Sequence, residues 1–465
     1  MEALSTDPKA KGRELTPAEA LLGPVRADLN AGHISAQHRD LAALHPADFA
    51  DLVAYLDASD RKALVHQMGQ LFTPDVLAEL NVGVREAVID WLPDRAVSSA
   101  LGALETDDAV ELAEELSEDE RARYLSGVEE RERAVIEAAL AYPEYSAGRL
   151  MSRDFVVAPQ NWAVGEVLDF LRAEENDNLP KEFYQLYLVD PAYRPVATVS
   201  LSRIMREPRE ARLSDLARAQ DLHPFIPTYD QEELAFKFRQ YHLVEAPVVE
   251  EETGRILGVV TVDDVLEVID EEAEDDLLKL VGLQGGESDV QISWWSTTRS
   301  RFIWLFVNLV TVVIAAAVIA QFSDLIEQYG TLAVLLPIVA SMGGNAGTQT
   351  LAVAVRGLAT KDLSLKNAGA FVRKELFVGF INGLGFAVIT AAAVIGIYGE
   401  PLLGLVIALS MVLNLLIAPL SGTLIPIALE RNGIDPANAS AVFLTTITDV
   451  VGFFAFLSLA AAIFL

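Results

Sequence analysis

Residues Pro337–Gln349 read PIVASMGGNAGTQ, a small and polar run inside an otherwise apolar segment. Three glycines, an Asn, a Thr and a Gln fall between the apolar stretches Leu332–Ala340 and Leu351–Val355. In a bilayer, backbone groups freed by Pro and Gly need partners inside the protein, so such a run is stable only where it packs against other helices or lines a wet path. The run therefore predicts a helical membrane domain and marks a candidate pore within it.

Two interpretations of this run compete. Glycines such as Gly343, Gly344 and Gly347 let helices approach closely, and taken alone they favour a packing face. Asn345 and Gln349 lie four residues apart on one helical face, where their amides would be costly against lipid. The two amides therefore favour an ion path.

The net charge of −32 is distributed unevenly along the 465 residues. Residues 299–465 carry eight basic and eight acidic side chains, so the whole surplus lies in the part before them. An acidic first half argues against nucleic acid and anionic lipid as its partners and favours cations, although solubility alone also explains acidity. The chain has no cysteine, which excludes disulfides and thiolate metal sites. Its opening residues lack the apolar core of a signal peptide, so we expect the first half to be cytoplasmic.

Residues 16–142 have helical periodicity, after a terminus (residues 1–15) that we expect to be disordered. Leu and Ala recur at three- and four-residue spacing, with breaks at Pro46, Pro74 and Pro93. Loosely similar short hairpins recur between these breaks. They predict an α-superhelical domain built from helix pairs, of either hand. The six histidines all lie in the first half without ligand spacing, and we expect them to be ordinary surface or core residues.

Residues 147–269 change to short β-branched runs that alternate with helices, in two copies of strand–helix–strand–strand–helix. The repeat, and especially GVVTVDDVLEVI, resembles a tandem pair of α/β CBS domains, which sense nucleotides or gate a partner domain. Thr261 and Asp264 match that family's pattern for holding the phosphate and ribose of an adenine nucleotide. The first copy has Ser200 and Arg203 at those positions and lacks the carboxylate. The resemblance therefore implies ATP at one site only, and many such pairs bind nothing.

The densest acidic run of the chain follows this repeat, in residues that we assign to a linker or plug helix (270–300). On a helix that begins at Asp263, these carboxylates crowd neighbouring turns and repel one another unless cations screen them. A solvated charged helix is the ordinary explanation, but a place between a sensor-like domain and the membrane favours metal binding. The segment also contains a Gly-Gly break, and Trp294 and Trp295 near its end are typical of an interfacial anchor.

Residues 301–465 contain apolar segments of spanning length, given about 20 residues per span. The five predicted spans are 302–322, 331–356, 376–398, 402–429 and 439–464. The loop at 356–375 carries five Lys and Arg side chains, whereas 323–330 and 399–401 carry none. By the positive-inside rule we expect the N-terminus inside the cell membrane and the C-terminus outside.

Asp449 lies in the last span, in TTITDVVG, with Thr445 one turn before it. An ionisable residue at membrane depth is costly and marks a cavity, a partner or an ion, with a structural hydrogen bond as the alternative. The run PxxxxxGGNxGxQ and the TxxDVxG of this span resemble the MgtE family of Mg²⁺ channels and transporters. The superhelix, the CBS pair, the linker helix and the five spans agree in order with that family, so the resemblance covers essentially the whole chain.

The resemblance implies an all-α membrane domain behind a helical domain and a CBS pair, and a homodimer with one pore between the protomers. Two Asp449 side chains would meet near the two-fold axis, backed by Asn345, Thr445 and the backbone at Gly344. Such oxygen ligands suit Mg²⁺, which gives up its waters reluctantly.

The resemblance also implies regulatory Mg²⁺ ions that draw acidic surfaces together and close the pore. The candidate ligands are carboxylates of the superhelix, the CBS pair and the linker: Asp107, Asp108, Glu111, Asp230, Asp264, Glu267, Glu272, Asp275 and Asp276. Mg²⁺ would then be both cargo and regulator of the protein.

Two other classes of function remain open at this point. One is a CBS-regulated secondary transporter of another divalent cation, such as Mn²⁺ or Co²⁺, or of a small organic ion. It would need a substrate-shaped set of charges inside the membrane, where Asp449 is the one charge that we find. The other class is an enzyme, which the absence of Cys and the position of every His outside the membrane half disfavour. The sequence leaves the choice between channel and carrier open.

Overall fold

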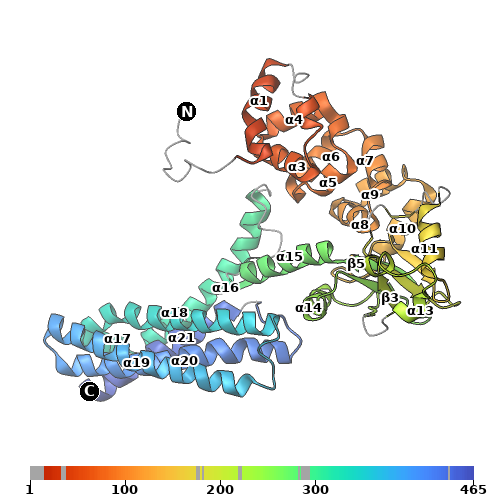
Figure 1. Cartoon of the computed structure of the whole chain (residues 1–465). Helices are drawn as coiled ribbons and strands as arrows, with labels where there is room; N and C mark the ends of the chain where they lie inside the picture. Colours follow the sequence, from red (N-terminus) through yellow and green to blue (C-terminus); the bar gives the residue numbers. More distant parts are fainter. Residues whose placement is uncertain are drawn as a thin grey trace. The chain divides into compact units, whose positions relative to one another are not determined.

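The computed structural model describes residues 15–32, 38–173, 179–180, 183–217, 222–280, 283, 294–437 and 440–465. The expected disordered terminus, apart from Leu15, and the Gly-Gly break at 285–286 lie outside these ranges, as does the side chain of Trp294. The chain divides into two compact units, Met1–Asp270 and Glu271–Leu465. Each unit has a core of its own, and Figure 1 shows their elements.

The first part of the first unit is helical throughout, as predicted. Its helices are α1 (Pro17–Ala31), α2 (His38–Leu41), α3 (Pro46–Tyr55), α4 (Ala58–Met68), the 3₁₀ turn η3 (Gly69–Leu71), α5 (Pro74–Ala78), α6 (Val82–Trp91), α7 (Asp94–Leu101), α8 (Thr106–Glu115), α9 (Glu118–Leu125) and α10 (Glu130–Leu140). The prolines at the predicted breaks start helices: Pro46 and Pro74 open α3 and α5, and Pro93 precedes α7. Proline suits the first turn because an amide there has no helical partner.

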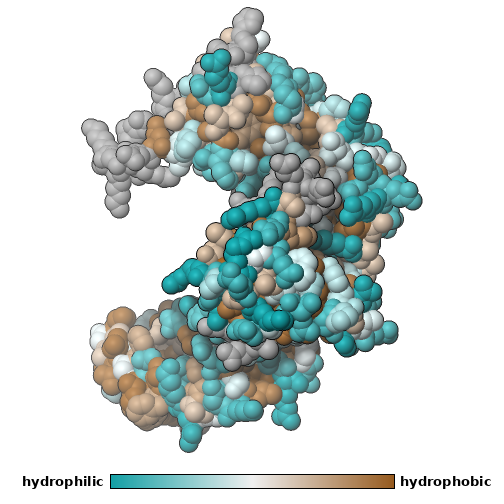
Figure 2. Space-filling model, turned by 45° about the vertical axis from the view of Figure 1, so that its right-hand side comes forward, coloured by the Kyte–Doolittle hydropathy of each residue, from teal (hydrophilic) through white to brown (hydrophobic). Residues whose placement is uncertain are grey.

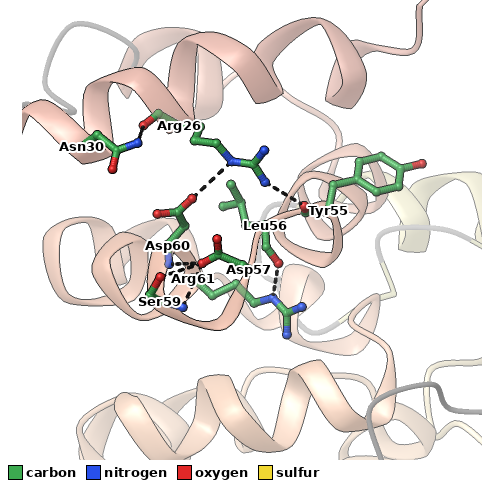
Figure 3. A network of polar contacts seen from close by, with 8 residues as sticks. All are labelled: Arg26, Asn30, Tyr55, Leu56, Asp57, Ser59, Asp60 and Arg61. Atoms are coloured by element: carbon green, nitrogen blue, oxygen red, sulfur yellow. Dashed lines mark hydrogen bonds and ion pairs between the residues drawn. The ribbon is translucent and has the colours of Figure 1, made fainter. Parts of the chain in front are cut away.

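A buried arginine recurs along these helices and accounts for their repeated appearance. Arg61, 7% exposed, donates from Nε to the carbonyl of Leu56 at 2.9 Å, as Figure 3 shows. Arg85, 4% exposed, donates in the same way to Leu80 at 3.0 Å. The half-buried Arg121 of α9 makes a related contact with the end of α8, from Nε to the Ala113 carbonyl and from Nη2 to the Leu116 carbonyl. Carbonyls at the end of a helix have no partner within it, so each arginine ties one helix to the end of the preceding one.

The second part of the first unit contains two α/β modules. The first has β1 (Val156–Pro159), α11 (Val164–Arg172), β2 (Gln185–Val189), β3 (Pro195–Ser200), α12 (Leu201–Ile204) and α13 (Leu213–Leu216). The second has α14 (Gln231–Tyr241), β4 (Glu245–Val249), β5 (Ile256–Thr261) and α15 (Val262–Leu280). Strand β2 pairs parallel with β1 and antiparallel with β3, and β4 pairs antiparallel with β5.

The strand that we predicted at the start of the second module is wrong in extent. Phe225 forms a single parallel bridge with Val248 in place of a full strand. Pro224 and Pro227 stand on either side of Phe225 and lack the amide hydrogens that a ladder requires, so the pairing stops after one residue.

The second unit is an all-helical membrane domain. It contains α16 (Trp294–Ala320), α17 (Ser323–Gln328), α18 (Thr331–Ala359), α19 (Ala368–Tyr398), α20 (Pro401–Arg431) and α21 (Ser440–Phe464). Within the residues described, five helices are long and apolar enough to cross a membrane: Thr297–Ala320, Thr331–Ala359, Ala368–Tyr398, Pro401–Arg431 and Ala441–Phe464. The five predicted spans are thus confirmed as helices of spanning length.

Three features of this domain bear on the candidate pore. The polar run Pro337–Gln349 remains helical throughout, inside α18. Helix α19 begins at Ala368, earlier than the predicted residue 376, and therefore includes a charged first part. Apolar side chains gather on the surface of the membrane helices in Figure 2. Phe302, Leu305 and Phe377 are among the exposed apolar residues of these helices. Such a surface fits contact with lipid.

Candidate ion pathway and regulatory site

The polar run of α18 has two faces with different roles. Gly343 and Gly347 are buried: a Cβ on Gly343 would overlap the Asn414 amide, and one on Gly347 would lie 2.8 Å from Leu444 Cδ1 of α21. Among the described residues, no atom comes within 4 Å of a Cβ placed on Gly344, and Asn345 beside it is exposed. The packing interpretation therefore holds for Gly343 and Gly347, and the ion path beside Gly344 and Asn345 stays a prediction.

Asp449 lies on α21, and its side chain is half-buried. No hydrogen bond or ion pair reaches its carboxylate from the described part of the chain. Thr445, one turn earlier, donates from Oγ1 to the carbonyl of Ala441 at 3.0 Å, so its hydroxyl keeps lone pairs that can accept a bond. The carboxylate is therefore available to a ligand.

Asn414 of α20 is a residue that the sequence reasoning missed. It is 1% exposed, and its Nδ2 donates to the carbonyl of Val339 at 2.6 Å, while no described residue donates to its buried Oδ1. Its amide lies against Gly343 of α18 and against Gly452 of α21, where a Cβ would stand 3.0 Å from Nδ2. One side chain thus contacts both helices that carry the predicted pore residues. A lone Asn inside an apolar helix was the available signal, because such a group is costly in lipid.

In the first unit, α8 and the start of α15 bring carboxylates together. Burial raises the pKa of Asp107 well above its usual range, and the charges of Asp264, Asp108 and Glu105 raise it further. The Oδ1 atom of Asp107 is buried, and no group in the described chain donates a hydrogen bond to it. Such an orphaned acceptor costs free energy unless a cation or a proton satisfies it.

Other predicted regulatory residues belong to the same cluster. Burial, followed by the charges of Glu111 and Asp264, raises the pKa of Asp108 to about 6. Burial also raises the pKa of Asp264 to about 6, against the hydrogen bonds that it accepts from Thr261. Burial and then Glu111 and Asp108 raise the pKa of Glu267. We call these residues the acidic cluster: Asp107, Asp108, Glu111, Asp264 and Glu267.

The structure places the remaining predicted ligands elsewhere. Asp230 caps α14 by accepting a bond from the Glu233 amide at 3.1 Å. Within the described residues, no group of three or more Asp, Glu and His side chains stands close enough to hold one metal ion as it is. Glu79 and Glu105, which the sequence analysis did not single out, act on the acidic cluster through their charges.

A second charged group lies in the membrane unit, at the end of α15. Lys279 Nζ contacts Asp275 Oδ2 at 2.5 Å and Asp435 Oδ2 at 2.6 Å. Burial and then the charge of Asp435 raise the pKa of Asp276 to about 6, with a smaller contribution from Glu272. The five predicted ligands of this stretch are therefore divided between the two units. Asp264 and Glu267 belong to the first unit, and Glu272, Asp275 and Asp276 belong to the second.

The two residues of the predicted nucleotide motif are hydrogen-bonded to each other. Thr261 donates to Asp264 Oδ2 from its hydroxyl and, at 3.2 Å, from its amide. An adenine nucleotide bound there would compete with this contact. The corresponding Ser200 of the first copy lies 3.3 Å from the hydroxyl of Ser202.

Three family models match the chain, each over a different part. The model for the divalent cation transporter MgtE matches residues 336–459, the MgtE intracellular N domain matches 44–145, and the CBS domain matches 221–271. The chain is 30% identical over 450 residues to the magnesium transporter MgtE of Thermus thermophilus, covering 95% of this chain and 98% of that protein. It is 28% identical over 419 residues to the magnesium transporter MgtE of Bacillus subtilis, covering 90% and 92%.

Two solved structures are similar to about half of the chain. The cytosolic domain of the Mg²⁺ channel MgtE in complex with ATP is 28% identical, with a TM-score of 0.49, over 53% of this chain and 100% of that one. The soluble part of a magnesium transporter is 25% identical, with a TM-score of 0.47, over 55% of this chain and 99% of that one.

Proposed function

This chain belongs to the MgtE family of divalent cation transporters, and from that premise we propose that it moves Mg²⁺ across the cell membrane along a path lined by Asp449. The observation that carries the proposal is the Asp449 carboxylate, which lies on a helix of spanning length and has no partner in the described chain. A charge held at that depth without a partner needs a function, and carboxylate oxygen is the ligand that Mg²⁺ prefers. The protein is accordingly a multi-pass membrane transporter and not an enzyme.

The path combines one face of α18 with one face of α21. Gly344 and Asn345 supply a backbone and an amide oxygen, and Thr445 and Asp449 supply a hydroxyl and a carboxylate. These groups can hold an ion through its water shell, so charge and hydrated size would select Mg²⁺. We place the path between two protomers of a homodimer, with the N-terminus inside the cell and the C-terminus outside.

Ion uptake by liposomes that contain the purified full-length protein tests this proposal. Asp449→Asn keeps the shape of the side chain and removes its charge, so we expect it to lose most Mg²⁺ uptake while its thermal unfolding stays within about 1 °C. Asp324→Asn in α17 is the matched control and should transport normally. Undiminished uptake by folded Asp449→Asn protein would sink the proposal. Uptake driven equally well by Mn²⁺, Co²⁺ or a small organic ion would favour the alternative transporter.

We further propose that the acidic cluster senses cytosolic Mg²⁺ and closes the path. Asp107, Asp108 and Asp264 carry like charges and are largely buried, and the Oδ1 atom of Asp107 accepts no hydrogen bond from the described chain. The repulsion and the unsatisfied oxygen each cost free energy, and a bound divalent cation removes both costs. The donor set is all oxygen, which fits Mg²⁺. By linkage, the ion favours the compact state only as far as it binds that state better.

We propose the end of α15 as a second regulatory position, where Asp275, Asp276 and Asp435 lie near Lys279. An adenine nucleotide such as ATP at Thr261 and Asp264 is a separate proposal. Its support is the spacing of these two residues, and it predicts that Thr261→Val weakens binding of a fluorescent ATP analogue.

A further inference from the structure

We propose that a cavity at one end of α18 and α19 binds the phosphate headgroup of an anionic phospholipid. The cavity has a volume of about 750 Å³. It lies where α18 ends and α19 begins, and its polar wall includes Arg356, Asn367 and Lys374. Both helices are of spanning length, so the cavity opens at the depth where lipid headgroups lie.

Two cations line this wall, and both can reach an anion in the cavity. The guanidinium of Arg356 is exposed and makes no hydrogen bond or ion pair with the described residues. Lys374 has one ion pair, at 3.4 Å with its neighbour Glu375, and its Nζ lies 5.7 Å from the Phe371 ring. A guanidinium fork beside an ammonium group is a combination that suits phosphate oxygens.

The other polar groups of the wall are already occupied. Asp362, the carboxylate of the lining, accepts a bond from the Thr360 hydroxyl at 2.9 Å. Asn367 accepts from the Ser364 amide at 2.7 Å and donates to the Asp362 carbonyl at 2.7 Å. These two polar groups are therefore satisfied within the connection between the helices. Asp362 keeps its negative charge and Glu375 pairs with Lys374, so Arg356 is the cation of the lining that has no partner among the described residues.

The apolar part of the lining favours a lipid over a soluble phosphate. Val353, Leu363 and Phe371 form this part, and Val353 is 52% exposed on a membrane helix. An acyl chain can lie against such a wall while its headgroup meets the cations, whereas a free phosphate gains nothing from it. Basic pockets between helices at the membrane surface recognise anionic headgroups in this way.

Native mass spectrometry of the full-length protein tests the site. Detergent-purified protein is titrated with phosphatidylglycerol and, separately, with phosphatidylcholine of the same acyl chains. We expect the wild type to retain phosphatidylglycerol preferentially. The double variant Arg356→Gln/Lys374→Gln should lose that preference at least ten-fold. The double variant Lys366→Gln/Arg373→Gln removes the same charge from the same end of these helices, at residues that do not line the cavity, and should keep the preference.

Any of four outcomes would overturn the proposal. If both double variants lose the preference for phosphatidylglycerol equally, the overall positive charge of this region attracts the lipid and the cavity is not a specific site. A wild type without preference for phosphatidylglycerol would mean that there is no site. Displacement of the lipid by excess glycerol 3-phosphate would assign the cavity to a soluble phosphate. If the first double variant does not fold, the single variant Arg356→Gln should still lose part of the preference, and unchanged preference in it would also contradict the proposal. None of these outcomes depends on Mg²⁺ transport.

Discussion

At the residue scale, two adjacent glycines of α18 have different surroundings. A methyl group on Gly343 would overlap the amide of Asn414, which is held by its bond to Val339. We therefore expect Gly343→Ala to destabilise the protein by about 1–3 kcal/mol, as overpacking does. The methyl group added by Gly344→Ala would have no described atom within 4 Å. We therefore expect this variant to fold normally and to reduce Mg²⁺ uptake.

Thermal unfolding and uptake measured on both variants decide between these roles, with Leu351→Val as the control for a mild change in the same helix. If Gly344→Ala unfolds early and transports normally, the assignment of the two faces is reversed. No sequence pattern distinguishes Gly343 from its neighbour, because which face of a helix is packed depends on residues such as Asn414, 71 positions away in the chain.

At the element scale, spanning helices were predictable because a bilayer requires about 20 apolar residues in a row. The residues at which these helices begin and end were harder to predict. Hydropathy marks the apolar core of α19, but the helix begins eight residues earlier, at Ala368, and includes Arg373 and Lys374. Charged residues can continue a helix beyond the lipid, so the apolar stretch and the helix do not coincide. The missing strand around Phe225 was readable, since the prolines on both sides of it forbid a ladder.

The end of α15 carries a prediction of its own. Lys279 joins Asp275 on the same helix to Asp435 on the α20–α21 connection, and Leu280 packs against the cluster formed by Leu351 and Leu444. The side chains of Lys279, Asp275 and Asp435 are 28%, 24% and 36% exposed, so each ion pair contributes less than about 1 kcal/mol. We expect Lys279→Gln to speed amide hydrogen exchange in residues 274–280 by a few-fold without lowering the melting temperature.

The charge-exchanged variant Lys279→Asp/Asp435→Lys is the matched control, because it restores one opposite pair at the same place. It should recover part of the lost protection. Unchanged exchange in Lys279→Gln would show that the apolar contact of Leu280 alone holds the end of the helix.

At the scale of the whole molecule, composition predicted cations as ligands, but only the fold shows which carboxylates meet. Asp107 and Asp264 are 157 positions apart and act on each other in the same unit. Asp230 has the same charge as Asp264 and lies in the same CBS pair, yet it caps helix α14. The sequence could not separate these roles, since every acidic residue contributes equally to net charge.

This difference gives the last prediction, which concerns the compactness of the first unit. Limited proteolysis of the full-length protein should show protection that rises with Mg²⁺ near the millimolar range, the scale of weak oxygen-ligand sites, on the order of 10⁻³ M. Asp107→Asn/Asp264→Asn keeps both side-chain shapes and removes their repulsion. We therefore expect the double variant to resist the protease without Mg²⁺ and to gain no further protection from it.

Asp230→Asn is the control, because asparagine also caps helices and the residue lies outside the acidic cluster. It should respond to Mg²⁺ like the wild type. If it loses the response as fully as the double variant, the ion binds elsewhere in the CBS pair. If wild-type digestion is identical with and without Mg²⁺, the acidity of this half serves solubility, and the path through the membrane must be controlled by another part of the protein. Protection of the double variant only when Mg²⁺ is present would mean that repulsion between Asp107 and Asp264 does not hold the unit open.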